Sequence, residues 1–123
     1  MRGVSEERGI VMKKFLVLYK ASQAEFDKAM KASPEEAQAG MDAWMAWSKK
    51  AASSIVDMGA PLGKTLRVTP SGATPTRNDL GGYSIMQGES REAVAETMKG
   101  HPHFMMGKDA TIEVVELMPI PGM

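Results

Sequence analysis

The fold class of this chain is decided by the stretch KKFLVLYK, residues 13–20. Its β-branched and aromatic residues favour an extended strand, in which successive side chains point to opposite faces. Phe15, Val17 and Tyr19 then share one face, while Leu16 and Leu18 share the other. We therefore expect this strand to lie in a sheet that is apolar on both sides.

A long helix is predicted to follow, beginning at Ser33. The run Ser-Pro-Glu-Glu at residues 33–36 supplies an N-cap, a first-turn proline and a capping-box glutamate. Apolar or small residues then recur with helical spacing at Ala37, Met41, Trp44, Met45, Ser48, Ala51, Ala52 and Ile55. We expect this stripe to pack in the core or against a second copy, and the helix to end at Gly59.

The remaining pattern predicts a shorter helical turn before the long helix, and three strands and one helix after it. These are a turn over 23–31, strands over 61–69, 83–87 and 111–118, a loop over 70–82, and a helix over 91–99 between Ser90 and Gly100. The order strand, helix, strand, strand, helix, strand predicts an α+β, ferredoxin-like βαββαβ domain. Two helices would cover one face of a four-stranded antiparallel sheet, and the other apolar face predicts a homodimer with stacked sheets.

Length and composition bound the function classes. The chain has 123 residues and 13.3 kDa, which is one domain, with 15 basic and 15 acidic residues and no cysteine. This balance argues against a nucleic-acid partner, and thiolate chemistry is excluded. No apolar run is long enough to span a membrane, and residues 1–12 lack the apolar stretch of a signal peptide. We expect a cytoplasmic protein.

Residues 1–11 show no sustained periodicity, and the patterned domain begins at Met12. Either Met12 is the natural start, which leaves residues 1–11 outside the natural domain, or residues 1–11 are an ordinary polar N-terminal arm. The domain itself is expected to occupy residues 12–123.

Both histidines of the chain, His101 and His103, flank Pro102 in one short segment. Histidine suits proton transfer near neutral pH, so the pair could act as general acid and base or as two ligands. The alternative is a polar loop in which one histidine caps the preceding helix. A metal site would need a third ligand, for which Asp42, Asp57 and Asp109 are candidates, and we expect neither a metal nor a cofactor.

Four further residues could contact a small ligand. Arg67 lies on the polar face of the second predicted strand and could hold a carboxylate or phenolate, or form a surface salt bridge. Tyr19 and Tyr83 could donate phenolic hydrogen bonds or be half-buried strand residues. Phe104 adjoins the histidine pair, and the methionines near it could line an adaptable apolar pocket or fill the core.

Several separated segments together resemble a known family. They are KKFLVLY at 13–19, MGAPL at 58–62, GYSI at 82–85, SREAV at 90–94 and IEVVELMP at 112–119. In this order and spacing they resemble the YCII-related family and its DGPF-type relatives. The resemblance implies a dimeric α/β barrel of ferredoxin-like protomers in a mostly uncharacterised family, a minority of which resemble small-molecule lyases such as dehydrochlorinases.

The chain departs from that family at the positions that carry its proposed catalysis. Members with proposed catalysis resemble one another in a histidine on the first long helix and an aspartate in an Asp-Pro-Phe stretch after the second. Here Asp42 falls on the helix and His101 precedes Pro102, and residues 76–80 read TRNDL in place of Asp-Gly-Pro-Phe. One hypothesis is that the two groups are exchanged and form an Asp42–His101 dyad. The alternative is that Asp42 points to water.

Two function classes follow. One is a cofactor-independent acid/base lyase or isomerase that acts on a small aromatic or carboxylated metabolite, with His101, His103 and Asp42 as catalytic residues. The other is a non-catalytic, small-molecule-binding or accessory dimer. An enzyme should place a histidine in a cleft, whereas a non-catalytic module would leave both rings solvated or engaged in capping.

Overall fold

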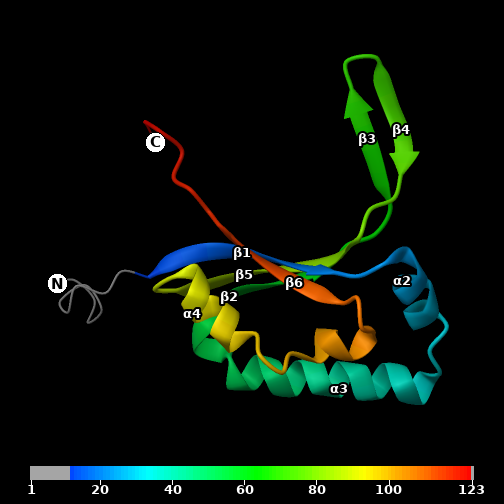
Figure 1. Ribbon diagram of the computed structural model, residues 1–123, viewed down its shortest axis with the longest axis horizontal. Helices are drawn as coiled ribbons and strands as arrows, with labels where there is room; N and C mark the ends of the chain where they lie inside the picture. Colours follow the sequence, from blue (N-terminus) through cyan, green and yellow to red (C-terminus); the bar gives the residue numbers. More distant parts are fainter. Residues whose placement is uncertain (1–11, 123) are drawn as a thin grey trace.

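The computed structural model describes residues 12–122, and it shows an α+β fold with a four-stranded antiparallel sheet, a separate two-stranded hairpin and three α-helices in this range (Figure 1). The elements in chain order are β1 (Lys13–Lys20), α2 (Gln23–Met30), α3 (Pro34–Lys50), η1 (Ala52–Ser54), β2 (Ile55–Pro61), β3 (Thr65–Thr69), β4 (Gly72–Thr76), β5 (Leu80–Gly88), α4 (Arg91–Thr97), η2 (Pro102–Met106) and β6 (Thr111–Glu116). η1 and η2 are 3₁₀ helices. The proposed N-terminal arm, residues 1–11, lies outside the described residues.

The sheet has the strand order β2-β5-β1-β6, and each neighbouring pair is antiparallel. The predicted first strand is confirmed at its bounds, because Lys13–Lys20 lies in the middle of the sheet between β5 and β6. Phe15, Val17 and Tyr19 are buried and pack against residues of α3 and of the α4 region. Figure 1 shows these two helices on one side of the sheet. The opposite side of the sheet is left open by the described residues.

The core lies between the sheet and these helices. Phe15, Val17, Tyr19 and Met86 from the strands meet Val94 and Met98 from the α4 region, and Trp44 and Trp47 of α3 pack against this cluster. At the end of β5, a side chain on Gly88 would come within 2.8 Å of Val94, so the glycine lets α4 approach the sheet closely. The helix caps are as predicted: Ser33 and Glu36 form a reciprocal capping box, and Ser90 caps α4.

The predicted end of the long helix is wrong. α3 ends at Lys50 rather than Gly59, and Ile55–Pro61 forms the edge strand β2. Helical spacing continued through Ala51, Ala52 and Ile55 by coincidence, whereas the β-branched pair Ile55 and Val56 favours a strand. Gly59 does not end a helix but lies within the strand β2. Its φ of 74° falls where the pairing with β5 shifts register, and a Cβ there would lie 1.8 Å from the Tyr83 carbonyl oxygen.

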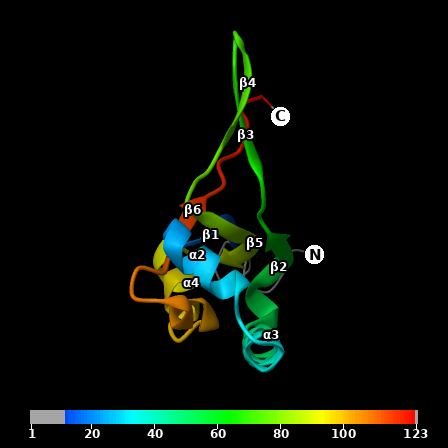
Figure 2. The same ribbon diagram turned by 90° about the vertical axis from the view of Figure 1, so that its right-hand side faces the viewer.

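The predicted second strand and the loop after it are also wrong. Residues 65–69 do not enter the main sheet but pair only with Gly72–Thr76, which the sequence suggested to be loop. The predicted helical turn over 23–31 is confirmed as helix α2, and together with this hairpin it is added to the simple strand, helix, strand, strand, helix, strand order that was expected. Figures 1 and 2 show the hairpin standing away from the sheet on its open side. We call residues 65–76 the arm.

No helix in the described range is long and apolar enough to cross a membrane.

Candidate functional site

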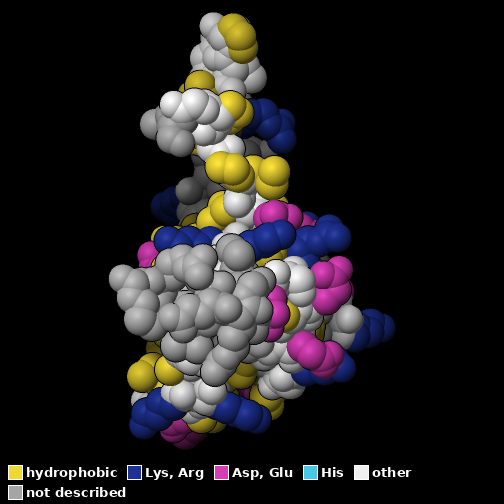
Figure 3. Space-filling view, turned by 90° about the vertical axis from the view of Figure 1, so that its left-hand side faces the viewer, with side chains coloured by type: hydrophobic (Ala, Val, Ile, Leu, Met, Phe, Trp, Pro, Cys, Tyr) yellow, Lys and Arg dark blue, Asp and Glu magenta, His cyan; other side chains and the backbone are white. Residues whose placement is uncertain are grey.

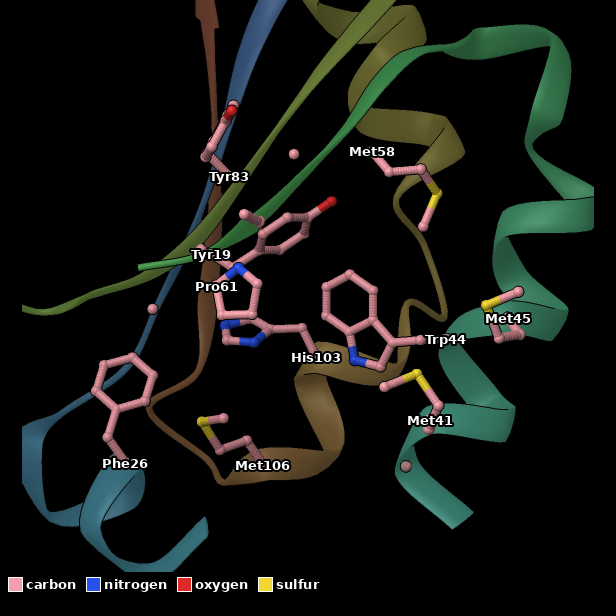
Figure 4. Close-up of a pocket in the computed structure, with 15 residues that line it drawn as sticks. Tyr19, Phe26, Met41, Trp44, Met45, Met58, Pro61, Tyr83, His103 and Met106 are labelled. Atoms are coloured by element: carbon pink, nitrogen blue, oxygen red, sulfur yellow. The ribbon is translucent and has the colours of Figure 1, made fainter. Parts of the chain in front are cut away.

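A pocket of about 440 Å³ opens between α3 and the β2 edge of the sheet. Its walls are mainly apolar and come from Tyr19, Phe26, Gly40, Met41, Trp44, Met45, Met58, Gly59, Ala60, Pro61, Gly81, Gly82, Tyr83, His103 and Met106. In Figure 4, Trp44, Met41 and Met45 of α3 stand on one side, opposite Tyr19, Pro61 and His103. The volume is sufficient for a compact aromatic molecule.

His103 is the histidine that lines this pocket. It is 4% exposed, and its Nε2 lies 2.8 Å from the carbonyl oxygen of Lys20 at the end of β1. A carbonyl can only accept, so Nε2 carries the proton and donates it. In the neutral ring, Nδ1 then keeps its lone pair, and no described residue forms a hydrogen bond with it. The backbone of β1 thus fixes His103 as a hydrogen-bond acceptor, or a base, at the pocket wall.

His101 is enclosed rather than open to a ligand. It is 1% exposed, and its Nδ1 accepts a hydrogen bond of 2.9 Å from the backbone N–H of His103. Its ring lies between the indoles of Trp44 and Trp47, at centroid distances of 4.4 and 4.3 Å, and stacks on Tyr19 at 5.0 Å. The other nitrogen, Nε2, is buried without a hydrogen-bond partner among the described residues.

Burial and, to a lesser extent, the charge on the nearby His103 together lower the pKa of His101 to about 4. His101 is therefore neutral at physiological pH. Because its Nδ1 accepts the His103 N–H, His101 holds the backbone from which His103 projects and acts as a positioning residue.

The local sequence explains this turn. Gly100 takes a φ of 74°, which lets the chain leave α4, and the residue before Pro102 is held extended, with φ −60° and ψ 138° at His101. Pro102 then begins η2, and the His101 ring caps it by accepting a hydrogen bond from the backbone N–H of His103. Capping was one predicted role for a histidine here, but the capped helix is the following one. The predicted polar loop is wrong, because both rings are buried.

A short hydrogen-bond chain leads from the pocket into the sheet. Ser84 donates from Oγ to the Met58 carbonyl at 2.9 Å, so the Tyr19 hydroxyl, 3.0 Å from the same Oγ, must donate to it. The Tyr19 oxygen keeps acceptor capacity, and burial raises the pKa of its phenol, which keeps it protonated. Together, Tyr19 and the His103 Nδ1 are fixed acceptors.

Phe26 of α2 closes one end of the pocket. A Cβ on Gly81 would lie 2.4 Å from the Phe26 ring, so the ring packs directly on the glycine backbone. Beyond Phe26 lies a second and wider hollow of about 990 Å³, bordered by α2 and the base of the arm, and Phe26 and Gly81 line both spaces. The ring therefore separates a compact pocket from an open groove.

Asp42 does not meet either histidine. It is exposed on α3 and accepts a hydrogen bond of 2.9 Å from Gln38 Nε2, one turn earlier. The hypothesised Asp42–His101 dyad is therefore not formed, since the two His101 nitrogens face the His103 backbone and the aromatic cluster. Among the described residues, no group of three or more His, Asp and Glu side chains is placed to hold a metal ion, and Asp57 and Asp109 form separate contacts with backbone N–H groups.

The four other residues that were predicted to contact a ligand do not all lie in the pocket. Tyr19 lies in the pocket, as described above. Arg67 is exposed on the arm, away from the pocket, because β3 is not part of the main sheet. Phe104 is 43% exposed and does not line the pocket. Tyr83 borders it from β5, but by register its side chain lies opposite Leu18 and so belongs to the open face of the sheet.

Sequence reasoning missed several pocket residues. Met41 and Met45 were expected to be packed, yet they are 58% and 48% exposed and form the wall on α3. Met58 and Pro61 were assigned to a helix end and a strand start, although they lie on the edge strand that forms the other rim. The adjacent Gly81 and Gly82 were the available signal, because paired glycines at a strand start allow a close approach. The Lys20 carbonyl carries no sequence signal.

Comparison of the chain with protein-family models finds no match, and none is found among curated proteins.

Proposed function

We propose that this protein binds a small aromatic molecule carrying a hydrogen-bond donor in the α3–β2 pocket, and acts on it as a cofactor-independent acid/base lyase or isomerase. His103 is the proposed base. The observation that carries the proposal is the hydrogen bond of 2.8 Å from His103 Nε2 to the Lys20 carbonyl, which leaves the Nδ1 lone pair for a ligand.

The walls define the ligand class. The lining residues include neither lysine nor arginine, so no cation is present to neutralise a carboxylate within this described pocket. Of the two ligand types expected from the sequence, the aromatic one is therefore better supported than the carboxylated one. Trp44, Tyr19 and the methionines offer flat and adaptable apolar contacts, while Tyr19 and His103 accept hydrogen bonds. A phenol or a similar donor-bearing aromatic fits both properties.

The fold is consistent with the family resemblance noted in the sequence. The strand order β2-β5-β1-β6 with two helices on one side supports a ferredoxin-like protomer to which α2 and the arm are added. We further propose that the protomer forms a homodimer, a dimeric α/β barrel of YCII-related type. Its support is the open sheet face, where Leu16, Leu18 and Ile85 are half-buried and Val115 is 42% exposed.

A non-catalytic binding module is the second candidate. It is favoured by the lack of Asp, Glu, Lys and Arg among the lining residues, which leaves His103 without a charged partner for proton transfer. The Tyr19 hydroxyl already donates its proton to Ser84, so it can accept a hydrogen bond from a ligand but has no proton to transfer to it. A histidine that only accepts a ligand hydrogen bond would need no such partner.

The first experiment tests binding. We expect 2-naphthol to bind the full-length wild-type protein in an NMR titration, with shifts at Trp44 and His103, and 2-naphthoic acid to bind at least about tenfold more weakly because its charge is unpaired. His103→Asn places an amide oxygen near the position of Nδ1 and should retain binding, whereas His103→Ala should lose about three- to tenfold in affinity. Equal affinity for the acid, or no binding of either compound, would reject the ligand class.

The second experiment separates the enzyme from the binding module. The flat carbon acid 2-indanone exchanges its α-protons with D₂O, and a base at Nδ1 should accelerate this exchange. We expect faster exchange with wild-type protein than with His103→Asn at equal occupancy of the pocket, because an amide is not a base. Equal exchange rates with retained binding would support the non-catalytic module.

A further inference from the structure

Phe26 is the only side chain that borders both the α3–β2 pocket and the wider groove beside it. The residues common to the two spaces are Phe26 and Gly81, and glycine has no side chain. The pocket measures about 440 Å³ and the groove about 990 Å³. The Phe26 ring is therefore the partition between a space of ligand size and a space more than twice as large.

The position of the ring depends on the glycine behind it. A Cβ on Gly81 would lie 2.4 Å from the Phe26 ring and 3.4 Å from the Tyr19 carbonyl oxygen. A larger residue at position 81 would therefore displace the ring, whereas the glycine backbone leaves room for it. The ring rests on the start of β5, beside the end of β1.

The helix that carries the ring is attached at the same end of the pocket. Ala21, which precedes α2, donates its N–H to the Asp79 carbonyl at 3.0 Å. Asp27 of α2 forms an ion pair of 3.1 Å with Arg77. These contacts tie α2 to the segment that leads directly into β5. Phe26 is the only aromatic residue of α2, and it is half-buried in a helix that has no fully buried residue.

We propose that Phe26 is a specificity-determining residue, which limits the ligand of the α3–β2 pocket to a compact aromatic molecule by closing the way into the groove. This inference rests on the proposed function, because it names what sets the size of the ligand that the pocket binds. A side chain gives specificity when it clashes with the wrong ligand. Removal of the ring should join the two spaces and admit a longer aromatic ligand.

The groove offers an apolar continuation of the pocket. Leu62 lines the groove and donates its backbone N–H to the Gly81 carbonyl at 3.1 Å, so it lies at the partition. Leu66 and Pro75 line the groove from the base of the arm. Figure 2 shows α2 below the arm, and Figure 3 shows hydrophobic side chains along the arm, above the body of the molecule. A ligand ring in place of the Phe26 ring would exchange water for apolar contacts.

The ring also lies beside the proposed base. In the view of Figure 4, Phe26 and Trp44 stand on either side of His103. A ligand whose hydroxyl donates to His103 can therefore direct its rings toward Trp44 or toward Phe26. The test covers both orientations with two isomers of a longer ligand.

The test compares one compact ligand with these two isomers. 2-Naphthol is the compact ligand, and 3-phenyl-2-naphthol and 6-phenyl-2-naphthol carry an additional ring beside the hydroxyl or at the far end. NMR titration measures the affinity of full-length wild-type, Phe26→Ala and Met30→Ala proteins for each compound. Met30 lies on the same helix, is 87% exposed and lines the groove but not the pocket, so its substitution is the matched control that keeps the partition.

We expect Phe26→Ala to bind 2-naphthol more weakly than the wild type, because an apolar wall is lost. It should bind at least one phenyl isomer more tightly, because the ligand ring fills the space that the side chain leaves. The affinity of that isomer relative to 2-naphthol should rise at least about tenfold, and Met30→Ala should change the same ratio less than about twofold. A general loss of structure would weaken all three complexes and could not produce this reversal.

Two outcomes separate this inference from the proposed function. If 2-naphthol binds the wild type but neither ratio rises tenfold in Phe26→Ala, Phe26 does not select the ligand, while the proposed pocket stands. If 2-naphthol does not bind the wild type, the proposed ligand class fails and the selection by Phe26 fails with it. Thermal melting checks the fold of each variant. Phe26→Leu, which removes the ring but keeps an apolar side chain, should raise the ratio at least about threefold and serves if the alanine variant does not fold.

The place of the additional ring gives a second readout. In the complex of Phe26→Ala with the favoured isomer, the phenyl protons of the ligand should show nuclear Overhauser effects to the Gly81 amide and to the Leu62 side chain. A tighter complex without these effects would put the additional ring elsewhere and would overturn the role of Phe26 as the partition.

Discussion

The two histidines lie two residues apart and share one residue type, yet the structure gives them opposite environments. His101 is sealed among Tyr19, Trp44 and Trp47, and its Nε2 has no polar partner in the described chain. His103 lines the pocket and is tied by Nε2 to the Lys20 carbonyl. The partner of one ring nitrogen decides what the other nitrogen can do.

The two histidines therefore have different roles: His101 positions the backbone, and His103 is the proposed ligand contact. The nitrogen of His101 that makes a hydrogen bond points to the backbone of His103, so His101 acts on the ligand only through its neighbour. The bonded Nε2 of His103 lies at the carbonyl of Lys20 in the sheet, and its other ring nitrogen has no hydrogen-bond partner among the described residues in a side chain that lines the pocket. Substitutions at His101 should therefore mainly lower the free energy of unfolding, and those at His103 should mainly lower the affinity for the ligand.

The largest expected effect is the loss of stability in His101→Ala. The substitution removes a fully buried ring from between two indoles and also removes the cap of η2, so we expect it to cost about 3 kcal/mol of unfolding free energy. His103→Ala leaves the Lys20 carbonyl without its donor and should cost about 1–2 kcal/mol. Urea unfolding measures both values. The reverse order would contradict the division between the two residues.

Acid should separate the histidines further. The pKa of His101 is lowered to about 4 in the folded chain, whereas the unfolded chain binds a proton near the ordinary value of 6.5. The stability contributed by neutral His101 is fully present above pH 6.5 and is lost as the pH falls from 6.5 to about 4. We expect unfolding midpoints to decline through this window in wild-type protein.

His101→Asn is the matched control for that decline. Asparagine can place an acceptor oxygen near the position of Nδ1 and does not titrate, so its unfolding midpoint should vary less between pH 6.5 and 4 than that of the wild type. Parallel pH profiles for the two proteins would show that other groups cause the decline.

A smaller effect is expected on ligand binding. His101→Asn keeps the acceptor that holds the His103 backbone, so its affinity for 2-naphthol should stay within about twofold of the wild-type value. His103→Ala should lose about three- to tenfold, which is the net contribution of one hydrogen bond. NMR titration at pH 7.5 compares them. If His101→Asn lost more affinity for 2-naphthol than His103→Ala, the assignment of the ligand contact to His103 would be wrong.

Much of the fold follows from local sequence signals. The strand over 13–20, the capping box at Ser33 and the Ser90 cap were predictable because each depends on residues close together in the chain. The bounds of β2 were not, because Ile55 satisfies both a helical and a strand pattern and only its pairing with Met86 distinguishes them. The arm was not predicted for a related reason. Glycine and proline in residues 70–82 are typical of a loop, yet the strand β4 contains both.

The site was less predictable than the fold. Both histidines could be singled out from their proximity in sequence, but their division of roles depends on the Lys20 carbonyl and on burial by Trp44 and Trp47, which come from distant segments. Arg67 was predicted to contact a ligand at the sheet, but it lies on β3, which pairs only with β4 in a separate hairpin. A carboxylate partner was sought on α3 at Asp42, although a backbone carbonyl performs the orienting role.

The smallest expected effect is that of Asp42→Asn, and its size distinguishes a backbone-oriented His103 from a carboxylate-assisted histidine. Asp42 is exposed and accepts its hydrogen bond from Gln38, and asparagine retains an oxygen for that contact. The substitution should change the unfolding free energy by less than about 0.5 kcal/mol. It should also leave 2-naphthol affinity, the 2-indanone exchange rate and the decline in stability between pH 6.5 and 4 unchanged. If Asp42→Asn instead slowed the exchange as much as His103→Asn, the carboxylate would have to approach the histidines during the reaction, and the Lys20 carbonyl would not be sufficient to orient the base.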